Sequence, residues 1–189
     1  MLYLVQYTGP IGYIKPWTAV RDSLTFSEKF LPPGTVEGIS QKLFGLNERS
    51  LIARYRLCFD AYSVQMEQTW AQQHKWEDKT KSINRGQSIL ERGVLLNPEL
   101  TLAFRSQEDA EAAFEQHVCL CRNEDILFPD TEYGIRAVSE DEFAALDGFE
   151  MIASTAESGI PAGRNRYEKG HPMTYGELIV QGNPVRHAF

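Results

Sequence analysis

The sequence is poor in three features that would assign the protein to a specialised class. It contains only three cysteines, and an odd number without framework spacing argues against a secreted disulfide scaffold. Its apolar runs are only a few residues long, too short for a helix that crosses a bilayer. The first residues, MLYLVQYTGPIGY, lack the basic and apolar regions of a signal peptide. These absences predict a globular protein with a cytoplasmic location.

Motifs for metal binding and catalysis are also missing. Cys119 and Cys121 would make half of a metal site, but no Cys or His pair with ligand spacing accompanies them. On a strand their side chains would share one face, and we expect both in the core. The sequence has no Walker loop, no glycine-rich dinucleotide motif and no Ser/His/Asp order. We therefore expect no metal, no cofactor and no catalytic residue.

Positive charge is scarce as well, because 19 basic residues face 26 acidic ones and leave a formal net charge of −7. Most nucleic-acid-binding proteins are basic, so this balance argues against that class at first sight. The charge is uneven, however. Residues 108–157 carry 14 acidic and 2 basic side chains, whereas residues 1–107 carry 13 basic and 10 acidic ones. The acidic segment is either a solvated face or a surface for a basic protein partner, and the flanks stay open to nucleic acid.

The hydrophobic pattern predicts an α+β domain. Strands are expected at 2–7, 51–64, 100–104 and about 133–138. One helix should begin with Thr35 as its N-cap and end at Gly45, and an acidic helix should follow a Ser106 cap. This order is that of a ferredoxin-like βαββαβ domain. We expect it over residues 1–140, followed by a small β-rich C-terminal appendage over residues 141–189.

Residues 66–93 differ from the predicted core elements, because they are polar, basic and carry two tryptophans without a helical period. This composition predicts an exposed insertion. Basic side chains bind phosphate, aromatic rings and Arg planes stack on unpaired bases, and Asn or Gln can bond base edges and 2′-hydroxyls. The alternative is a solvated loop without function. The candidate RNA-binding residues here are Trp76, Lys79, Lys81, Asn84, Arg85, Gln87 and Arg92.

A second candidate patch lies in the long loop over residues 9–33, which is rich in Gly, Pro and aromatic residues. Its RNA-binding candidates are Tyr13, Lys15, Trp17 and Arg21. The alternative for the tryptophan is a ring packed on the domain.

Other arginines leave two interpretations open. Arg122 either binds RNA or pairs with a nearby carboxylate. Arg54 and Arg56 either line an RNA-facing surface of the sheet or form its solvated face. Arg164 and Arg166 either contact nucleic acid or a neighbouring subunit, or belong to a flexible solvated loop.

Four stretches of sequence, in the right order, resemble a single family. They are Gly9-Pro10 through Lys15-Pro16-Trp17 to Leu31-Pro32-Pro33-Gly34-Thr35 and Gly38; Lys79-Thr80-Lys81-Ser82-Ile83-Asn84 with Arg92; Leu95-Leu96-Asn97-Pro98-Glu99-Leu100-Thr101-Leu102; and Leu120-Cys121-Arg122-Asn123-Glu124-Asp125-Ile126-Leu127. Together they cover most of residues 1–130 and resemble the Cas-five family of CRISPR effector subunits, within the RAMP superfamily, in its type I-B-like branch. Cys121 stands where that family has Gly.

The resemblance implies a ferredoxin-like RAMP domain with a protruding β-hairpin, and a non-catalytic RNA-binding subunit of a type I CRISPR effector complex, or Cascade. Such a subunit holds the 5′ handle of the CRISPR RNA and joins the backbone and large subunits for RNA-guided DNA targeting, in antiviral defence or with a transposon. Target DNA near its flanking motif is a further candidate partner, and no membrane is expected.

Two alternatives remain at this point. One branch of the family cleaves CRISPR RNA without metal through a Tyr, Lys and His set, for which His74 and Lys75 with Tyr55 or Tyr62 would be the candidates. In the other alternative, the acidic segment makes the chain a protein-interaction module.

Overall fold

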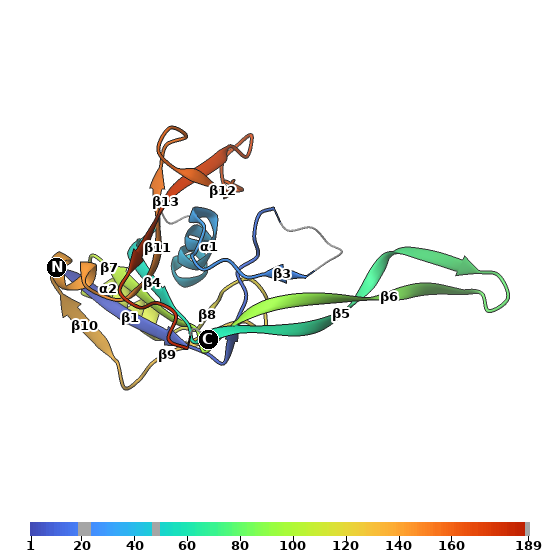
Figure 1. The fold of residues 1–189 in the computed structure, drawn as a ribbon, viewed down its shortest axis with the longest axis horizontal. Helices are drawn as coiled ribbons and strands as arrows, with labels where there is room; N and C mark the ends of the chain where they lie inside the picture. Colours follow the sequence, from blue (N-terminus) through green and yellow to red (C-terminus); the bar gives the residue numbers. More distant parts are fainter. Residues whose placement is uncertain (19–23, 47–49, 188–189) are drawn as a thin grey trace.

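The computed structural model describes residues 1–18, 24–46 and 50–187, and it describes residues 70–75 and 84–88 by their backbone alone. Figure 1 shows a body built on a central sheet, from one end of which a long two-stranded hairpin projects. A smaller group of strands stands upright beside α1, above the body in this view. The candidate site residues are distributed over these three parts.

The central sheet is antiparallel, with the order β4-β7-β1 and with β9 and β10 both paired to the far side of β1. Its strands are β1 (Leu2–Thr8), β4 (Ile52–Cys58), β7 (Glu99–Phe104), β9 (Ile126–Pro129) and β10 (Ile135–Val138), and the short β8 (Val118–Cys119) pairs with β9. Cross-strand partners share a face of a sheet. Val5 and Leu102 therefore point to one face, and Leu4 and Ala103 to the other. All four are fully buried, so both faces of the sheet are covered.

Two helices cover one face and a third covers part of the other. Ile39 and Leu43 of α1 (Pro33–Phe44) and Ala113 of α2 (Gln107–Phe114) belong to the same buried cluster as Val5. On the opposite face, Phe143 of α3 (Glu140–Ala144) packs with Leu4. Among the described residues, no helix has the length and apolar character needed to cross a membrane.

The ends of the helices agree with the sequence at two of the three predicted positions, Gly45 and Ser106. Gly45 terminates α1 with a φ of +108°, which glycine adopts at little cost. Ser106 caps α2 and accepts a hydrogen bond of 3.1 Å from the Asp109 amide. The predicted N-cap Thr35 is wrong, because α1 begins at Pro33. Proline at the first helical position lacks an N–H that would have no helical partner there, and its fixed φ suits the helix.

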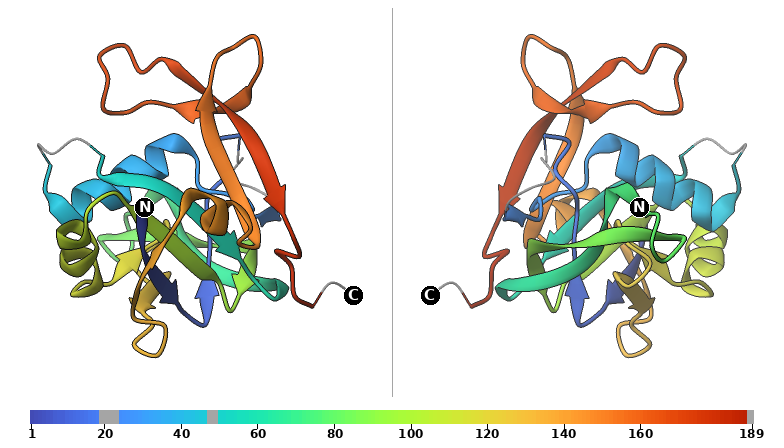
Figure 2. Two further views of the ribbon diagram at one scale, coloured as in Figure 1. Left: turned by 90° about the vertical axis from the view of Figure 1, so that its left-hand side faces the viewer. Right: turned by 90° about the vertical axis from the view of Figure 1, so that its right-hand side faces the viewer.

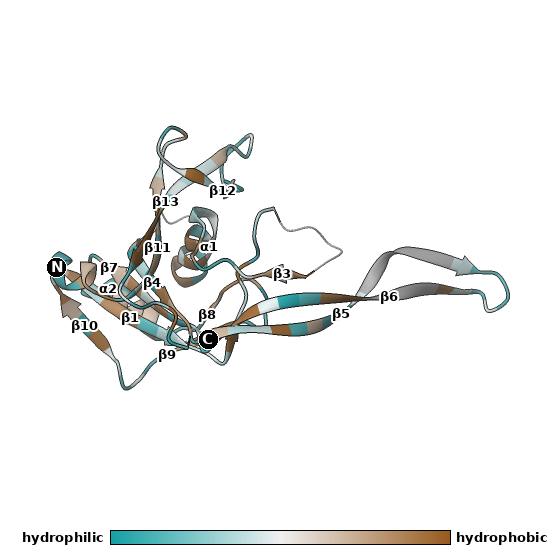
Figure 3. Ribbon diagram, viewed as in Figure 1, coloured by the Kyte–Doolittle hydropathy of each residue, from teal (hydrophilic) through white to brown (hydrophobic). Residues whose placement is uncertain are grey.

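The predicted strand 51–64 is divided in two. β4 ends at Cys58, and β5 (Ala61–Glu77) begins a second sheet with β6 (Ser82–Leu96). These two long strands form the projecting hairpin, and residues 66–93 make up most of it. The short strands β2 (Ile11–Gly12) and β3 (Thr25–Phe26) pair with the last residues of β6 and hold the base of the hairpin. Figure 3 shows apolar residues concentrated in the strands of the body, and mixed polar and apolar bands along the base of the hairpin.

The C-terminal strands, which we call the appendage, are β11 (Gly148–Ser154), β12 (Ile160–Arg164) and β13 (Met173–Gln181). β13 pairs with β11 over its length and with β12 on its other side. The appendage extends the central sheet, but the register of β11 with β4 consists of one pair, Phe149 with Leu57. Figure 2 shows β11 and β13 rising past α1, so that β12 stands above this helix.

Candidate nucleic-acid interface

The sequence-predicted site residues that the structure describes lie in three places: the tip of the hairpin, the base of the hairpin, and a groove beside the appendage. Arg21 lies outside the described residues. The register of the hairpin places Asn84 and Arg85 opposite Lys75 and His74, and Gln87 opposite Trp70.

The tip of the hairpin presents an exposed aromatic ring and two ammonium groups. The Trp76 side chain is 60% exposed, and its indole N–H donates a 2.7 Å hydrogen bond to the Asp78 carboxylate. Lys79 and Lys81 are exposed in the turn between the strands. Lys81 has a φ of +47°, an uncommon conformation for a side-chain-bearing residue. The tip therefore offers cations and a stacking surface far from the body, as Figure 1 shows.

The base of the hairpin holds Tyr13, Arg92 and Arg122 together, but in contacts within the protein. The guanidinium carbons of Arg92 and Arg122 lie 5.4 and 5.3 Å from the centroid of the buried Tyr13 ring. Burial raises the pKa of the Tyr13 hydroxyl, and the two nearby guanidinium groups oppose that shift. The Arg92 Nε lies 3.4 Å from a Glu67 carboxylate oxygen. These contacts join the hairpin to the first loop.

Arg122 takes the second of its two predicted alternatives. Its side chain donates two hydrogen bonds of 2.9 and 2.6 Å to the fully buried Asp125 carboxylate, and this bonding raises the pKa of the guanidinium. The Arg122 amide also donates to Asp125, at 2.9 Å. A charge held by a bidentate carboxylate keeps its position well but has less capacity left for a phosphate.

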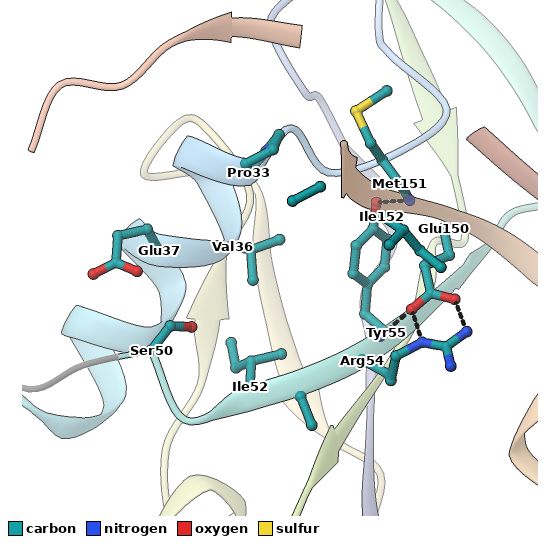
Figure 4. Close-up of a pocket in the computed structure, with 12 residues that line it drawn as sticks. Pro33, Val36, Glu37, Ser50, Ile52, Arg54, Tyr55, Glu150, Met151 and Ile152 are labelled. Atoms are coloured by element: carbon teal, nitrogen blue, oxygen red, sulfur yellow. Dashed lines mark hydrogen bonds and ion pairs between the residues drawn. The ribbon is translucent and has the colours of Figure 1, made fainter. Parts of the chain in front are cut away.

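Arg54 and Arg56 fit neither interpretation, since they bind a buried carboxylate. Arg54 donates hydrogen bonds of 2.5 and 2.6 Å to Glu150, and Arg56 is hydrogen-bonded to the same carboxylate. Both guanidinium groups lie over the Phe143 ring, at 5.0 and 4.8 Å from its centroid. The Tyr55 hydroxyl also accepts a hydrogen bond of 2.6 Å from the Met151 amide. Figure 4 shows this contact beside a cavity of about 350 Å³ between α1, β4 and β11. These contacts fasten the appendage to the body.

Lys15 and Trp17 belong to an open groove of about 750 Å³ between the first loop, the start of α1 and the appendage. Its basic lining residues are Lys15, Arg164, Arg166 and His171, and its aromatic lining residues are Trp17 and Tyr167. Among the residues that the structure describes, those that line the groove include no carboxylate. In a chain with 26 acidic residues, this composition makes the groove suited to an anion.

The loop after β12 is shaped by its own hydrogen bonds. The Asn165 amide donates to the Pro172 carbonyl at 2.9 Å, and the Asn165 side chain accepts from the Tyr167 amide at 3.0 Å. Gly163 lies beside Trp17 and has a φ of +116°, a conformation that favours glycine. The basic side chains of this loop thus face the predicted patch of the first loop.

Tyr167 and His171 are the residues of the groove that sequence reasoning missed. The run Arg164-Asn165-Arg166-Tyr167 combines charge with an aromatic ring, and that pattern was the available signal. Its neighbours in space are about 150 residues earlier in the chain, and no local pattern indicates such a proximity.

The prediction that Cys119 and Cys121 both lie in the core is wrong. Cys119 is partly exposed, and Cys121 is exposed and lines the groove. β8 ends at Cys119, so the alternation of a strand does not extend to Cys121. Within the described residues, no group of three His, Cys, Asp or Glu side chains is arranged to hold a metal ion.

Comparisons with known proteins give a match of fold to solved structures, and none of sequence. No protein-family model matches the sequence, and no curated protein is significantly similar to it. A chain of a solved structure entitled "CRISPR RNA-guided surveillance complex" has a similar fold, with a TM-score of 0.53 and 10% identity. The match covers 96% of this chain and 90% of that chain. At 10% identity the similarity is one of fold, and it extends over the body, the hairpin and the appendage together.

Proposed function

We propose that this protein is an RNA-binding subunit of a Cascade-type CRISPR RNA-guided complex, and that it belongs to the Cas-five family. The observation that carries the proposal is the fold likeness to a chain of such a complex over 96% of this sequence. The groove supports it, because its described lining residues place several cations and no carboxylate at one concave surface of an acidic chain.

The fold assignment proposed with this function is the ferredoxin-like βαββαβ domain. Its support is the order β4-β7-β1-β9, in which α1 connects β1 to β4 and α2 connects β7 to the last strand of the sheet. In this assignment β5 and β6 are an insertion between the second and third strands of the motif, and the appendage follows the motif.

In the proposed complex the protein holds the 5′ handle of the CRISPR RNA with its hairpin tip and its groove, and it carries out no catalysis. Trp76, Lys79 and Lys81 supply the tip, and Lys15 and Trp17 belong to the groove. The exposed acids of α2 and α3 lie at the end of the body away from the hairpin, where protein partners of the complex can bind without phosphate nearby (Figure 1). The proposed partners are the backbone and large subunits.

The first experiment isolates the affinity-tagged protein from its own host and sequences the RNA that accompanies it. The expected result is a population of CRISPR RNAs with one common, repeat-derived 5′ segment, together with backbone and large subunits. Recovery of the protein free of RNA and of those subunits would overturn the proposal.

A matched pair of variants then tests the tip. Lys79→Ala combined with Lys81→Ala should weaken RNA retention as the salt concentration rises. For each phosphate that the variant no longer binds, the slope of log affinity against log salt should change by about 0.7. The control removes two exposed arginines at the other end of the body, Arg105→Ala with Arg136→Ala. Equal effects of both pairs would show a general charge effect and count against the tip.

A further inference from the structure

We propose that the groove between the first loop, α1 and the appendage holds a single unstacked nucleotide of the bound RNA, with the base on an aromatic ring and the phosphate against the arginines of the loop after β12. This inference rests on the proposed function and names the ligand of the groove. It also gives the appendage a role, which is to supply one wall of a nucleotide site.

The positive charges of the groove have no carboxylate paired with them among the described residues. The ion pairs of the described residues involve Arg54, Arg56, Arg92, Arg122 and Arg186, each with a carboxylate of this chain. Within that same part of the chain, no carboxylate lies within ion-pair distance of the three groove cations Lys15, Arg164 and Arg166. Arg164 donates a hydrogen bond of 3.3 Å to the His171 carbonyl, which leaves its charge uncompensated. Three cations that converge on one concavity without a carboxylate partner are typical of a site for a phosphate.

The groove also contains two aromatic rings on which a base can stack. Trp17 is 49% exposed and Tyr167 is 51% exposed, and both line the groove. About half of the surface of each residue is therefore open to a ligand. Bases that have left a stack bind exposed aromatic rings without regard to sequence. A base within a duplex has no free face, so the ligand is single-stranded.

The N-terminus of α1 adds positive electrostatic potential to the groove. α1 begins at the groove, through Pro32, Gly34 and Thr35. Pro32 cannot cap the helix with its side chain, and the first turn contains no acidic residue. A 12-residue helix places partial positive charge at this end, which adds to that of the arginines.

The groove adjoins the base of the hairpin, and this favours a nucleotide within an RNA strand over a free nucleotide. Lys15 and Cys121 line the groove, and each lies within two residues of the cluster formed by Tyr13, Arg92 and Arg122 at the base of the hairpin. A chain that leaves the groove can therefore pass directly to the hairpin. The volume of about 750 Å³ lies within the range of pockets that hold small organic ligands.

The test uses the complex reassembled from its subunits around a fluorescein-labelled synthetic CRISPR RNA, which carries one 5-iodouridine at a varied position of the common 5′ segment. Irradiation should cross-link one position of the RNA to Trp17 or Tyr167, as identified by mass spectrometry of the peptides. Cross-links confined to other parts of the chain would overturn the proposal.

Variants give an independent measurement of affinity. Arg164→Ala with Arg166→Ala should reduce the salt dependence of binding by about 0.7 in the slope of log affinity against log salt, because both arginines are proposed to contact the same phosphate. Trp17→Ala should weaken binding by about tenfold, and Trp17→Phe should restore most of that loss because a ring is kept. The control is Arg105→Ala with Arg136→Ala, which should leave affinity unchanged.

The outcomes separate this inference from the proposed function. If the complex retains RNA while the groove variants bind as well as the control, the groove inference is wrong and the proposed function stands. If the complex carries no RNA, the proposed function fails first. If a nucleoside monophosphate or single-stranded DNA of the same sequence displaces the RNA at equal concentration, the assignment to an RNA strand is overturned.

Discussion

Replacing Glu150 by glutamine should destabilise the protein far more than the loss of a surface charge does. The Glu150 side chain is 2% exposed and accepts hydrogen bonds from both Arg54 and Arg56. Glutamine keeps the size of the side chain and one oxygen acceptor, but it carries no charge. Two guanidinium groups then lose the carboxylate that compensates them.

The magnitude follows from the burial of the two arginines. The Arg56 side chain is 3% exposed, so its charge cannot be rehydrated without opening the structure. Breaking one partner of a buried ion pair costs about 3–5 kcal/mol. The Arg54 side chain is 28% exposed and can turn towards water, so the loss of its partner adds little to the destabilisation. We expect a loss of about 3 kcal/mol in the free energy of unfolding, or about 6–12 °C in Tm for a protein of this size.

The assay is urea denaturation followed by far-ultraviolet circular dichroism, with the slope m compared between variants. The matched control is Glu99→Gln, which removes the carboxylate of the more exposed pair with Arg186, at 2.8 Å. This control substitution should lower the free energy of unfolding by at most about 1 kcal/mol. Replacing Arg56 and Glu150 together by methionine should be less harmful than Glu150→Gln alone, because no unpaired buried charge remains and the partly exposed Arg54 can turn towards water. Equal losses for Glu150→Gln and Glu99→Gln would refute the reasoning.

Three further predictions concern single positions. Burial raises the pKa of the Cys58 thiol to about 11, so a thiol reagent at neutral pH should modify exposed Cys121 and reach Cys58 only when urea is present; modification of both at the same rate would contradict this. Because the folded pKa is the higher one, the stability that this thiol contributes is complete below its unfolded pKa and is lost as pH rises towards 11, which denaturation at increasing pH measures. Gly9→Ala should cost about 1–3 kcal/mol in urea denaturation, since the new methyl group would lie 2.6 Å from the Ile126 carbonyl oxygen, and an unchanged midpoint would exclude that clash. Ser106→Ala should cost about 1 kcal/mol through the lost cap of α2, whereas Ser106→Asp should retain most of it in the same measurement.

Elements with strong local signals were predictable from the sequence. Ser106 followed by acidic residues predicted the start of α2, and the apolar run after Met1 predicted β1, because a cap and a buried strand depend on neighbouring residues. The N-cap of α1 was misplaced by three residues, from Pro32 to Thr35, since Thr35 offered a side-chain cap and Pro33 a fixed φ. The proline decided the start.

The candidate site was predictable in part. Lys15, Trp17 and the hairpin lysines were recognised by residue type and are exposed where a ligand can reach them. Tyr13 was recognised by the same criterion, but it is buried under two guanidinium groups. Composition does not distinguish an aromatic ring that is exposed to a ligand from one that is covered by an arginine of the same protein.

The sequence by itself determined where charge accumulates, that β1 and α2 form, and that residues 66–93 differ from the core elements. Those properties depend on residues close together in the chain. Only the tertiary structure decided which charges are paired with a carboxylate. It paired Glu150 of the acidic segment with Arg54 and Arg56, and it brought Arg164 and Arg166 beside Lys15 in a groove whose described lining residues include no carboxylate. The physical reason is that a charge acts according to its distance from other charges and from water, and for residues about 100 or more positions apart that distance is a property of the fold.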